Sequence, residues 1–263
     1  MPKGKGAGFH ANKNLYAMTG LICAVEFEHE EVLKNLSRRR QVEYGGLIFY
    51  RGLLRGRCLV LVASGVGKTN AAHAATLFLE KFRPEIIINF GVGGAYPDSG
   101  ISVGGIAVAD QEIYGDEGVV TPSGFMDMRG MGIPLLSNPG PGLNAKRPKR
   151  NLFNKIPIHS MPVKKACRIL KKLSFNPGKG PFVTLSTVTG TAERAAELQR
   201  RYRAICENME GASVAHICML YGVPFLEIRG ISNMVEDRDR RRWRLKEAAA
   251  ECQRAVMGVV SQW

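Results

Sequence analysis

Two hydrophobic patterns alternate along the chain: apolar runs with few polar positions, and stretches with apolar residues three and four positions apart. The runs predict strands and the stretches predict helices. Because both faces of the runs are apolar, we expect helices to cover the sheet on both sides. The strands are expected at 21–25, 57–63, 85–90, 105–110, 181–188 and 224–232, and the helices at 69–82, 163–173, 191–202, 210–222 and from about Trp243 onward. This alternation predicts a single α/β domain with a mainly parallel sheet.

Two segments interrupt the alternation. Residues 1–20 are basic and contain glycine, and the apolar run after them is too short for a signal peptide, so we expect a loose leader before a domain of residues 21–263. Residues 122–161 are dense in Gly, Pro, Asn and basic side chains, which predicts a long loop or insertion. Long loops are often lids, so a position over a site is one hypothesis for this insertion.

Charge and cysteine content narrow the choice of partners. The formal net charge of +14 suits nucleic acid, an anionic membrane or an acidic substrate. The basic clusters lack interleaved aromatics, however, and no nucleic-acid motif is visible, so we expect neither a nucleic-acid nor a membrane partner. The six cysteines form no C-x-x-C pair, which favours buried free thiols, a cytoplasmic location and no metal site. We expect no cofactor.

The segment "SGVGKT" (64–69) ends like a phosphate-binding loop. The Walker pattern needs its first glycine at the position that Val62 occupies, inside a predicted strand, so the loop is too short for an NTPase. What remains is a tight turn into a helix, whose N-terminus favours anions and polar groups. Tight packing of the strand against the helix would also explain the glycines.

A second group of glycines, Gly91, Gly93 and Gly94, follows the strand at 85–90. We expect a turn here that lets a ligand approach the backbone. Tyr96 occupies the last position of the dinucleotide-binding pattern, so that function is not supported. Ligands of open α/β sheets bind beyond the carboxyl ends of strands, and both glycine turns are expected on that edge.

Polar side chains also gather at this edge. Glu210 is expected near a helix N-terminus, where a carboxylate is favoured, and Ser232 and Asn233 end a predicted strand. Four acids follow the first strand: Glu26, Glu28, Glu30 and Glu31. Most of these acids are expected to be solvated, and one could project into a site.

Several segments together resemble the purine nucleoside phosphorylase/nucleosidase superfamily. They are "SGVGKTNAAHAATLFLE", "IIINFGVGGA", "ENMEGASVAHICMLYGVPFLEIRGISN" and the early acidic turn. Order and spacing match from Leu21 onward, except in the insertion, and Met-Glu-Gly followed by Arg-Gly-Ile-Ser-Asn is the most specific part. The resemblance implies a three-layer α/β/α fold with a mixed, mainly parallel central sheet. It also implies cleavage of an N-ribosidic bond in a small nucleoside, by a homodimer or higher homo-oligomer.

The resemblance assigns roles to individual residues. Glu210 would hold the ribose hydroxyls with Met209 packed on the sugar, and Glu28 would be the base that activates water. These roles suit the oxocarbenium-like transition state of such cleavage, which also needs a donor to the leaving base, here Asn233. The other residues expected to contact the substrate are Val92, Gly93, Thr189, Gly190, Thr191, Asn208 and Trp243.

Residue 233 bears on the substrate. The segment "GVPFLEIRGISNMVEDRDRRRW" is most similar to futalosine hydrolases, nucleosidases of the alternative menaquinone pathway that release hypoxanthine. Methylthioadenosine/S-adenosylhomocysteine nucleosidases resemble the segment but carry Asp at the position of Asn233. An ionised Asp would repel the O6 of hypoxanthine, whereas an Asn amide can donate to it. Futalosine also carries a carboxylate, which the arginines at 238 and 240–242 would suit.

We therefore predict a nucleosidase that hydrolyses the N-ribosidic bond of futalosine and releases hypoxanthine. Four alternatives stay open. A phosphorylase acting on inosine or guanosine is the nearest, followed by a methylthioadenosine/S-adenosylhomocysteine nucleosidase. A basic nucleic-acid-binding protein would show binding that falls steeply with salt and no cleavage of nucleosides. An NTPase would hydrolyse ATP in a Mg²⁺-dependent reaction.

Overall fold

The structure is a computed structural model that describes residues 18–137 and 151–263. The expected leader lies outside these residues except for its last three positions, and residues 138–150 of the expected insertion also lie outside them. The elements in chain order are β1 (Thr19–Cys23), η1 (Glu26–Glu28), α1 (Glu30–Lys34), β2 (Ser37–Tyr44), β3 (Leu47–Leu54), β4 (Arg57–Ala63), α2 (Lys68–Phe82), β5 (Ile86–Ala95), η2 (Pro97–Ser99), β6 (Ile106–Tyr114), β7 (Gly118–Thr121), β8 (Gly124–Asp127), β9 (Lys155–Pro157), α3 (Ser160–Lys172), β10 (Gly178–Thr184), α4 (Ala192–Tyr202), β11 (Cys206–Asn208), α5 (Gly211–Tyr221), β12 (Phe225–Met234), η3 (Arg240–Arg242) and α6 (Leu245–Ser261).

One large mixed sheet forms the centre of the molecule, in the order β11-β10-β6-β12-β5-β1-β4-β3-β2. The pairs β1–β4, β1–β5, β5–β12, β6–β10 and β10–β11 are parallel, whereas β2, β3 and β4 form an antiparallel meander. The short strand β11 also pairs antiparallel with β5. The strands β5, β12, β6, β10 and β11 therefore close into a ring at one end of the sheet.

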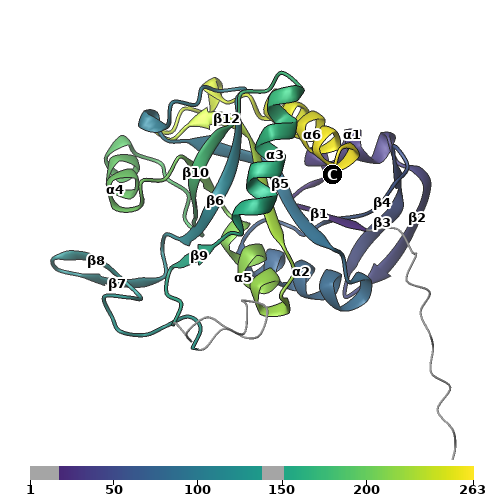
Figure 1. Cartoon of the computed structure of the whole chain (residues 1–263). Coiled ribbons are helices and arrows are strands. Elements are labelled where there is room, and N and C mark those ends of the chain that lie inside the picture. Colours follow the sequence, from purple (N-terminus) through teal and green to yellow (C-terminus); the bar gives the residue numbers. More distant parts are fainter. Residues whose placement is uncertain (1–17, 138–150) are drawn as a thin grey trace, which may run out of the picture.

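Helices cover both faces of this sheet (Figure 1). α2 and α5 pack together on one face, and α3 and α6 pack on the other. Successive residues of β1 alternate between these layers: Leu21 and Cys23 belong to the core under α3 and α6, and Ile22 to the core under α2 and α5. The expected three-layer α/β/α fold is confirmed. None of the described helices is both long and apolar enough to cross a membrane.

The structure corrects one expectation and adds elements to another. The glycines at 91–94 do not form a turn, because β5 continues through them to Ala95 with partners on both sides. Glycine is required there by close packing: a Cβ on Gly93 would lie 2.7 Å from Sγ of Cys206. The segment expected as a loop at 122–161 contains β8, β9 and the start of α3 within its described part.

Candidate active site

Glu28 is the most enclosed of the acids that follow β1. It ends the short helix η1, and only 2% of the residue is exposed. Its Oε2 accepts hydrogen bonds from the backbone N–H groups of Ala24 (2.9 Å) and Val25 (3.2 Å), and its Oε1 accepts one from Val92 (2.7 Å). Burial raises the pKa of Glu28, while Arg229 and the N–H of Val92 act in the opposite direction. A carboxylate has about four acceptor positions, so three N–H donors leave room for a water molecule.

Glu210 lies at the N-terminal end of α5, as the sequence predicts, and only 4% of it is exposed. Its Oε1 accepts a hydrogen bond from the backbone N–H of Gly67 at 3.0 Å, in the turn before α2. Its Oε2 accepts one from Nη2 of Arg229 at 3.3 Å. The glycine turn that resembles a phosphate loop therefore holds a carboxylate of the protein.

Lys68 begins α2 directly after that turn. Its Nζ forms ion pairs with Asp116 and, at 2.8 Å, with Glu117, in the loop between β6 and β7. Asp116 in turn accepts a hydrogen bond from the backbone N–H of Ser186 at 2.6 Å. Lys68 thus ties the start of α2 to the loops after β6 and β10.

Arg229 on β12 joins the two predicted catalytic carboxylates. Its Nη1 donates to the backbone oxygen of Val92 at 3.1 Å, and the N–H of the same residue donates to Glu28. Its Nη2 contacts Glu210, and its Nε donates to Glu227 at 2.8 Å. Burial alone would lower the pKa of Arg229, but the three carboxylates around it raise the pKa. One buried cation therefore organises Glu28, Val92 and Glu210 into a continuous network.

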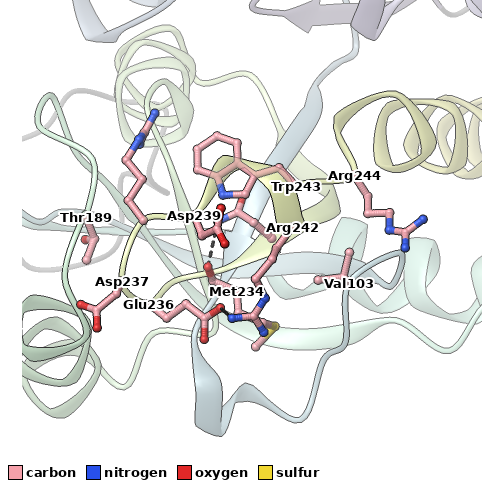
Figure 2. A pocket seen from close by; sticks show the side chains of 11 residues that line it. Val103, Thr189, Met234, Glu236, Asp237, Asp239, Arg242, Trp243 and Arg244 are labelled. Atoms are coloured by element: carbon pink, nitrogen blue, oxygen red, sulfur yellow. Dashed lines mark hydrogen bonds and ion pairs between the residues drawn. The ribbon is translucent and has the colours of Figure 1, made fainter.

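A pocket of about 150 Å³ is lined by three of the residues that the sequence analysis placed in the site: Thr189, Asn233 and Trp243. Figure 2 shows Trp243, Arg242 and Arg244 on the segment that follows β12, with Thr189 across the pocket. Neither Glu28 nor Glu210 lines this pocket.

Asn233 presents an oriented amide at the pocket wall. The hydroxyl of Ser232 donates to its Oδ1 at 2.7 Å, and its Nδ2 donates to the backbone oxygen of Met234 at 3.0 Å. An amide nitrogen carries two hydrogens, so one donor remains for a ligand.

Thr189 is fixed by a buried carboxylate that sequence reasoning missed. Its backbone N–H donates to Oε1 of Glu207 at 2.9 Å, and its hydroxyl donates to Oε2. The hydroxyl of Tyr96 also donates to Glu207, at 3.2 Å. The segment "CENMEG" carries two glutamates, but only Glu210 belongs to the Met-Glu-Gly motif. Nothing in the sequence indicated a role for Glu207.

The other residues that were predicted to contact the substrate lie in three places. Asn208 and Met209 adjoin Glu210, and Oδ1 of Asn208 accepts the N–H groups of Glu210 (2.9 Å) and of the residue after it (2.7 Å). Gly190 and Thr191 are exposed instead, and the hydroxyl of Thr191 accepts the N–H of Arg194 at 3.2 Å as the N-cap of α4. The backbone oxygen of Gly93 lies 3.2 Å from the hydroxyl oxygen of Ser232.

The arginines that were expected to bind a substrate carboxylate have different surroundings in the structure. Arg238 and Arg242 line the pocket, with the guanidinium of Arg238 4.6 Å from the centre of the Trp243 ring. Arg242 is paired with Glu236 at 2.6 Å, and Arg241 is paired with Asp239. Arg244 is a further lining arginine that the sequence analysis did not single out.

Gly91 is predicted to be essential for the position of Glu28. A Cβ atom at residue 91 would lie 2.3 Å from Oε1 of Glu28, well inside contact distance. Gly91→Ala should therefore displace the carboxylate and lower kcat by about 100-fold, the scale of a misplaced general base. Gly46→Ala is the control for substituting a glycine with a positive φ angle, because nothing lies near its Cβ position. Equal activity of the Gly91→Ala variant and the wild type would contradict the placement of Glu28.

Comparison with known proteins agrees with the fold. A family model described as the phosphorylase superfamily matches residues 19–261, so the chain belongs to this superfamily. The expected superfamily is thus confirmed.

Two curated relatives are nucleosidases by name. The chain is 29% identical over 218 residues to a 5'-methylthioadenosine/S-adenosylhomocysteine nucleosidase of Staphylococcus haemolyticus, covering 82% of this chain and 86% of the relative. It is 27% identical over 249 residues to the enzyme of the same name from Staphylococcus aureus strain MRSA252, covering 93% and 100%. The expectation of an enzyme of the N-glycosyl hydrolase class is confirmed.

A solved structure supports the fold. The nucleosidase of that name from Neisseria meningitidis, in complex with methylthio-immucillin-A, superposes with a TM-score of 0.79 at 23% identity. The match covers 94% of this chain and 100% of that one.

Proposed function

We propose that the protein hydrolyses the N-ribosidic bond of a purine nucleoside, with Glu28 activating water and Glu210 binding the ribose hydroxyls. The observation that supports this proposal is the buried network in which Arg229 and Val92 link the two carboxylates. Departure of the base leaves positive charge on the ribose, and two buried carboxylates stabilise that charge. Glu28 accepts the proton of the attacking water, and Asn233 donates to the leaving base.

The comparisons favour an adenine nucleoside as the substrate. The relatives are named for 5'-methylthioadenosine and S-adenosylhomocysteine, which supports this alternative from the sequence analysis better than it supports futalosine. Both compounds carry a substituent on the 5' carbon of ribose, and the pocket lined by Trp243 and Met234 offers apolar surface for it.

Futalosine is the second candidate, and Asn233 is the observation that favours it. The hydroxyl of Ser232 fixes the amide so that Nδ2 keeps a free hydrogen at the pocket wall. That hydrogen complements the O6 acceptor of a 6-oxopurine such as hypoxanthine. Arg238 and Arg244 in the same pocket complement the carboxylate of futalosine, whereas Arg242 is paired with Glu236.

One assay tests the reaction and separates the substrates. The protein is incubated with methylthioadenosine, S-adenosylhomocysteine, futalosine and inosine, with and without phosphate, and free base is measured by chromatography. Adenine release supports the first candidate and hypoxanthine release from futalosine the second. Release from inosine that requires phosphate would contradict hydrolysis and favour the phosphorylase alternative.

Asn233→Asp should move the preference away from 6-oxopurines. The substitution replaces a donor with an ionised acceptor facing O6, a mismatch of about 1–3 kcal/mol that corresponds to roughly a 5- to 150-fold loss of kcat/KM for futalosine. The ratio of kcat/KM for futalosine to that for methylthioadenosine is the measurement. Asn176→Asp, at an exposed position before β10, is the control. An unchanged ratio would show that residue 233 does not contact the base.

We also propose that the protein forms a homo-oligomer and is located in the cytoplasm. The sequence analysis expects both properties. The hairpin of β7 and β8 extends from the body of the molecule (Figure 1). Val120 on β7 is 82% exposed. Sedimentation velocity measures the oligomeric state directly.

A further inference from the structure

Two carboxyl groups that the proposed reaction does not use lie beneath the Arg229 network. Glu112 on β6 and Glu227 on β12 are both fully buried. A Cβ atom on Gly211 would lie 2.2 Å from Oε2 of Glu227 and 2.7 Å from Oε2 of Glu112. Both carboxyl groups thus face one point at the start of α5, and their Oε2 atoms lie close to each other. The glycine of the Met-Glu-Gly motif makes room for this pair.

The two groups have unequal partners. Oε1 of Glu227 accepts the charged Nε of Arg229 at 2.8 Å, which stabilises the anion. Glu112 has no cationic partner among the described residues: its Oε2 accepts the hydroxyl of Thr184 at 3.0 Å, and its Oε1 has no partner there. Two buried carboxylates in contact repel each other unless one holds a proton. Burial and the charge of Glu227 raise the pKa of Glu112 well above its ordinary value, so Glu112 is the protonated member.

Glu112 also reaches Glu210 by a second path. The Thr184 hydroxyl that contacts Glu112 accepts the backbone N–H of Ala212 at 2.8 Å, in the first turn of α5. Glu210 immediately precedes that turn, and its Oε2 is held by Arg229. Glu210 is thus held by two structures, the first turn of α5 and the guanidinium of Arg229. The carboxyl pair is linked to the first through Thr184 and to the second through Glu227.

We propose that Glu112 is a neutral positioning residue that shares its single proton with Glu227, keeps Glu227 anionic against Arg229 and so holds Glu210 in place. The role of Glu210 rests on the proposed function. The shared proton does not, because it follows from the contacts within the folded protein.

The first experiment measures the proton without any substrate. The Tm of the wild type and of Glu112→Gln is followed by circular dichroism from about pH 5 to about pH 8, a range in which the unfolded chain has released the proton of Glu112. A folded state that retains the proton loses stability as the pH rises. The Tm of Glu112→Gln should therefore increase relative to that of the wild type across this range.

The other charged or titratable groups that face the pair are the same in both proteins, so the difference isolates residue 112. These groups are Glu227 and Arg229 from β12, Glu210 before α5, Glu28 from η1, Cys206 from β11 and Tyr114 from β6. Glu43→Gln, which removes an exposed carboxyl from β2, controls for the loss of one acid. Parallel Tm curves for the wild type and Glu112→Gln would overturn the shared proton.

The second experiment tests positioning with the nucleoside that the wild type cleaves. Glu112→Leu removes the donor to Glu227 and should lower kcat by about tenfold, whereas Glu112→Gln can still donate and should restore most of it. Glu227→Gln keeps the shape but removes the anion against Arg229, and should also lower kcat by about tenfold. Wild-type kcat in Glu227→Gln, or in a folded Glu112→Leu, would overturn the positioning role. A wild type that cleaves no nucleoside would refute the proposed function while leaving the Tm result intact.

Discussion

Replacement of Glu28 by glutamine is expected to abolish most turnover while leaving the fold intact. Glutamine keeps the size of the side chain, and its one amide oxygen can still accept the N–H groups of Ala24 and Val25, but its NH2 group cannot accept the N–H of Val92 and it cannot take a proton from water. Loss of a general base lowers kcat by about 100- to 10,000-fold. The measurement is base release at saturating nucleoside, with circular dichroism to confirm the fold.

The pH profile adds a second readout for Glu28. Only the ionised carboxylate can accept a proton, so kcat/KM of the wild type should rise with pH through the pKa of Glu28. Burial raises that pKa, which places the rise above the range of an exposed glutamate. Glu26→Gln, an exposed acid in the same turn, is the matched control and should keep the profile. Turnover near the wild-type rate in Glu28→Gln would assign the base to another residue.

Arg229→Met should destabilise the protein more than any other single substitution in the network. The guanidinium is 2% exposed and is paired with Glu227 and Glu210. Removal of one partner from a buried ion pair leaves uncompensated charge and costs about 3–5 kcal/mol in the free energy of unfolding. Urea unfolding followed by tryptophan fluorescence measures this change. The decrease in unfolding free energy caused by Arg229→Met should become smaller as the pH falls, because protonated carboxyl groups carry no charge for the guanidinium to compensate.

Arg241→Met is the control for removing an arginine. Its side chain is 89% exposed and pairs with Asp239 in the described part of the chain, so the unfolding midpoint of this variant should match that of the wild type. Equal midpoints for Arg229→Met and the wild type would mean that the buried carboxyl groups are neutral and need no cation.

The apolar runs predicted the central strands because those strands are buried on both faces. The strand at 57–63 has the expected bounds, and β5 and β12 extend the expected ones. The prediction missed β2, whose sequence "SRRRQVEY" is exposed along its whole length and has no apolar run. It also placed a turn at the glycines of β5, because the sequence cannot show that neighbouring strands press against that backbone.

The candidate site was predictable where a motif lies at an element boundary. Glu210 at the start of α5 and Asn233 near the end of β12 are found where the sequence analysis expects them, although their roles remain proposals. Arg229 was missed because it lies inside an apolar strand pattern, where nothing in the local sequence reveals its partners. Glu112 and Glu227 are close only because β6 and β12 are adjacent in the sheet, a contact that needs the topology.

The place of β12 in the sheet has a consequence for how the protein folds. β12 is the last strand of the chain, but it lies between β5 and β6, which are synthesised much earlier. The pairing of β12 with both strands has to wait until the end of the chain is made, and such long-range closure is slow. Val92 on β5 and Arg229 on β12 meet only at that step. Enzyme activity should therefore be the last property to return on refolding, after most of the helix content.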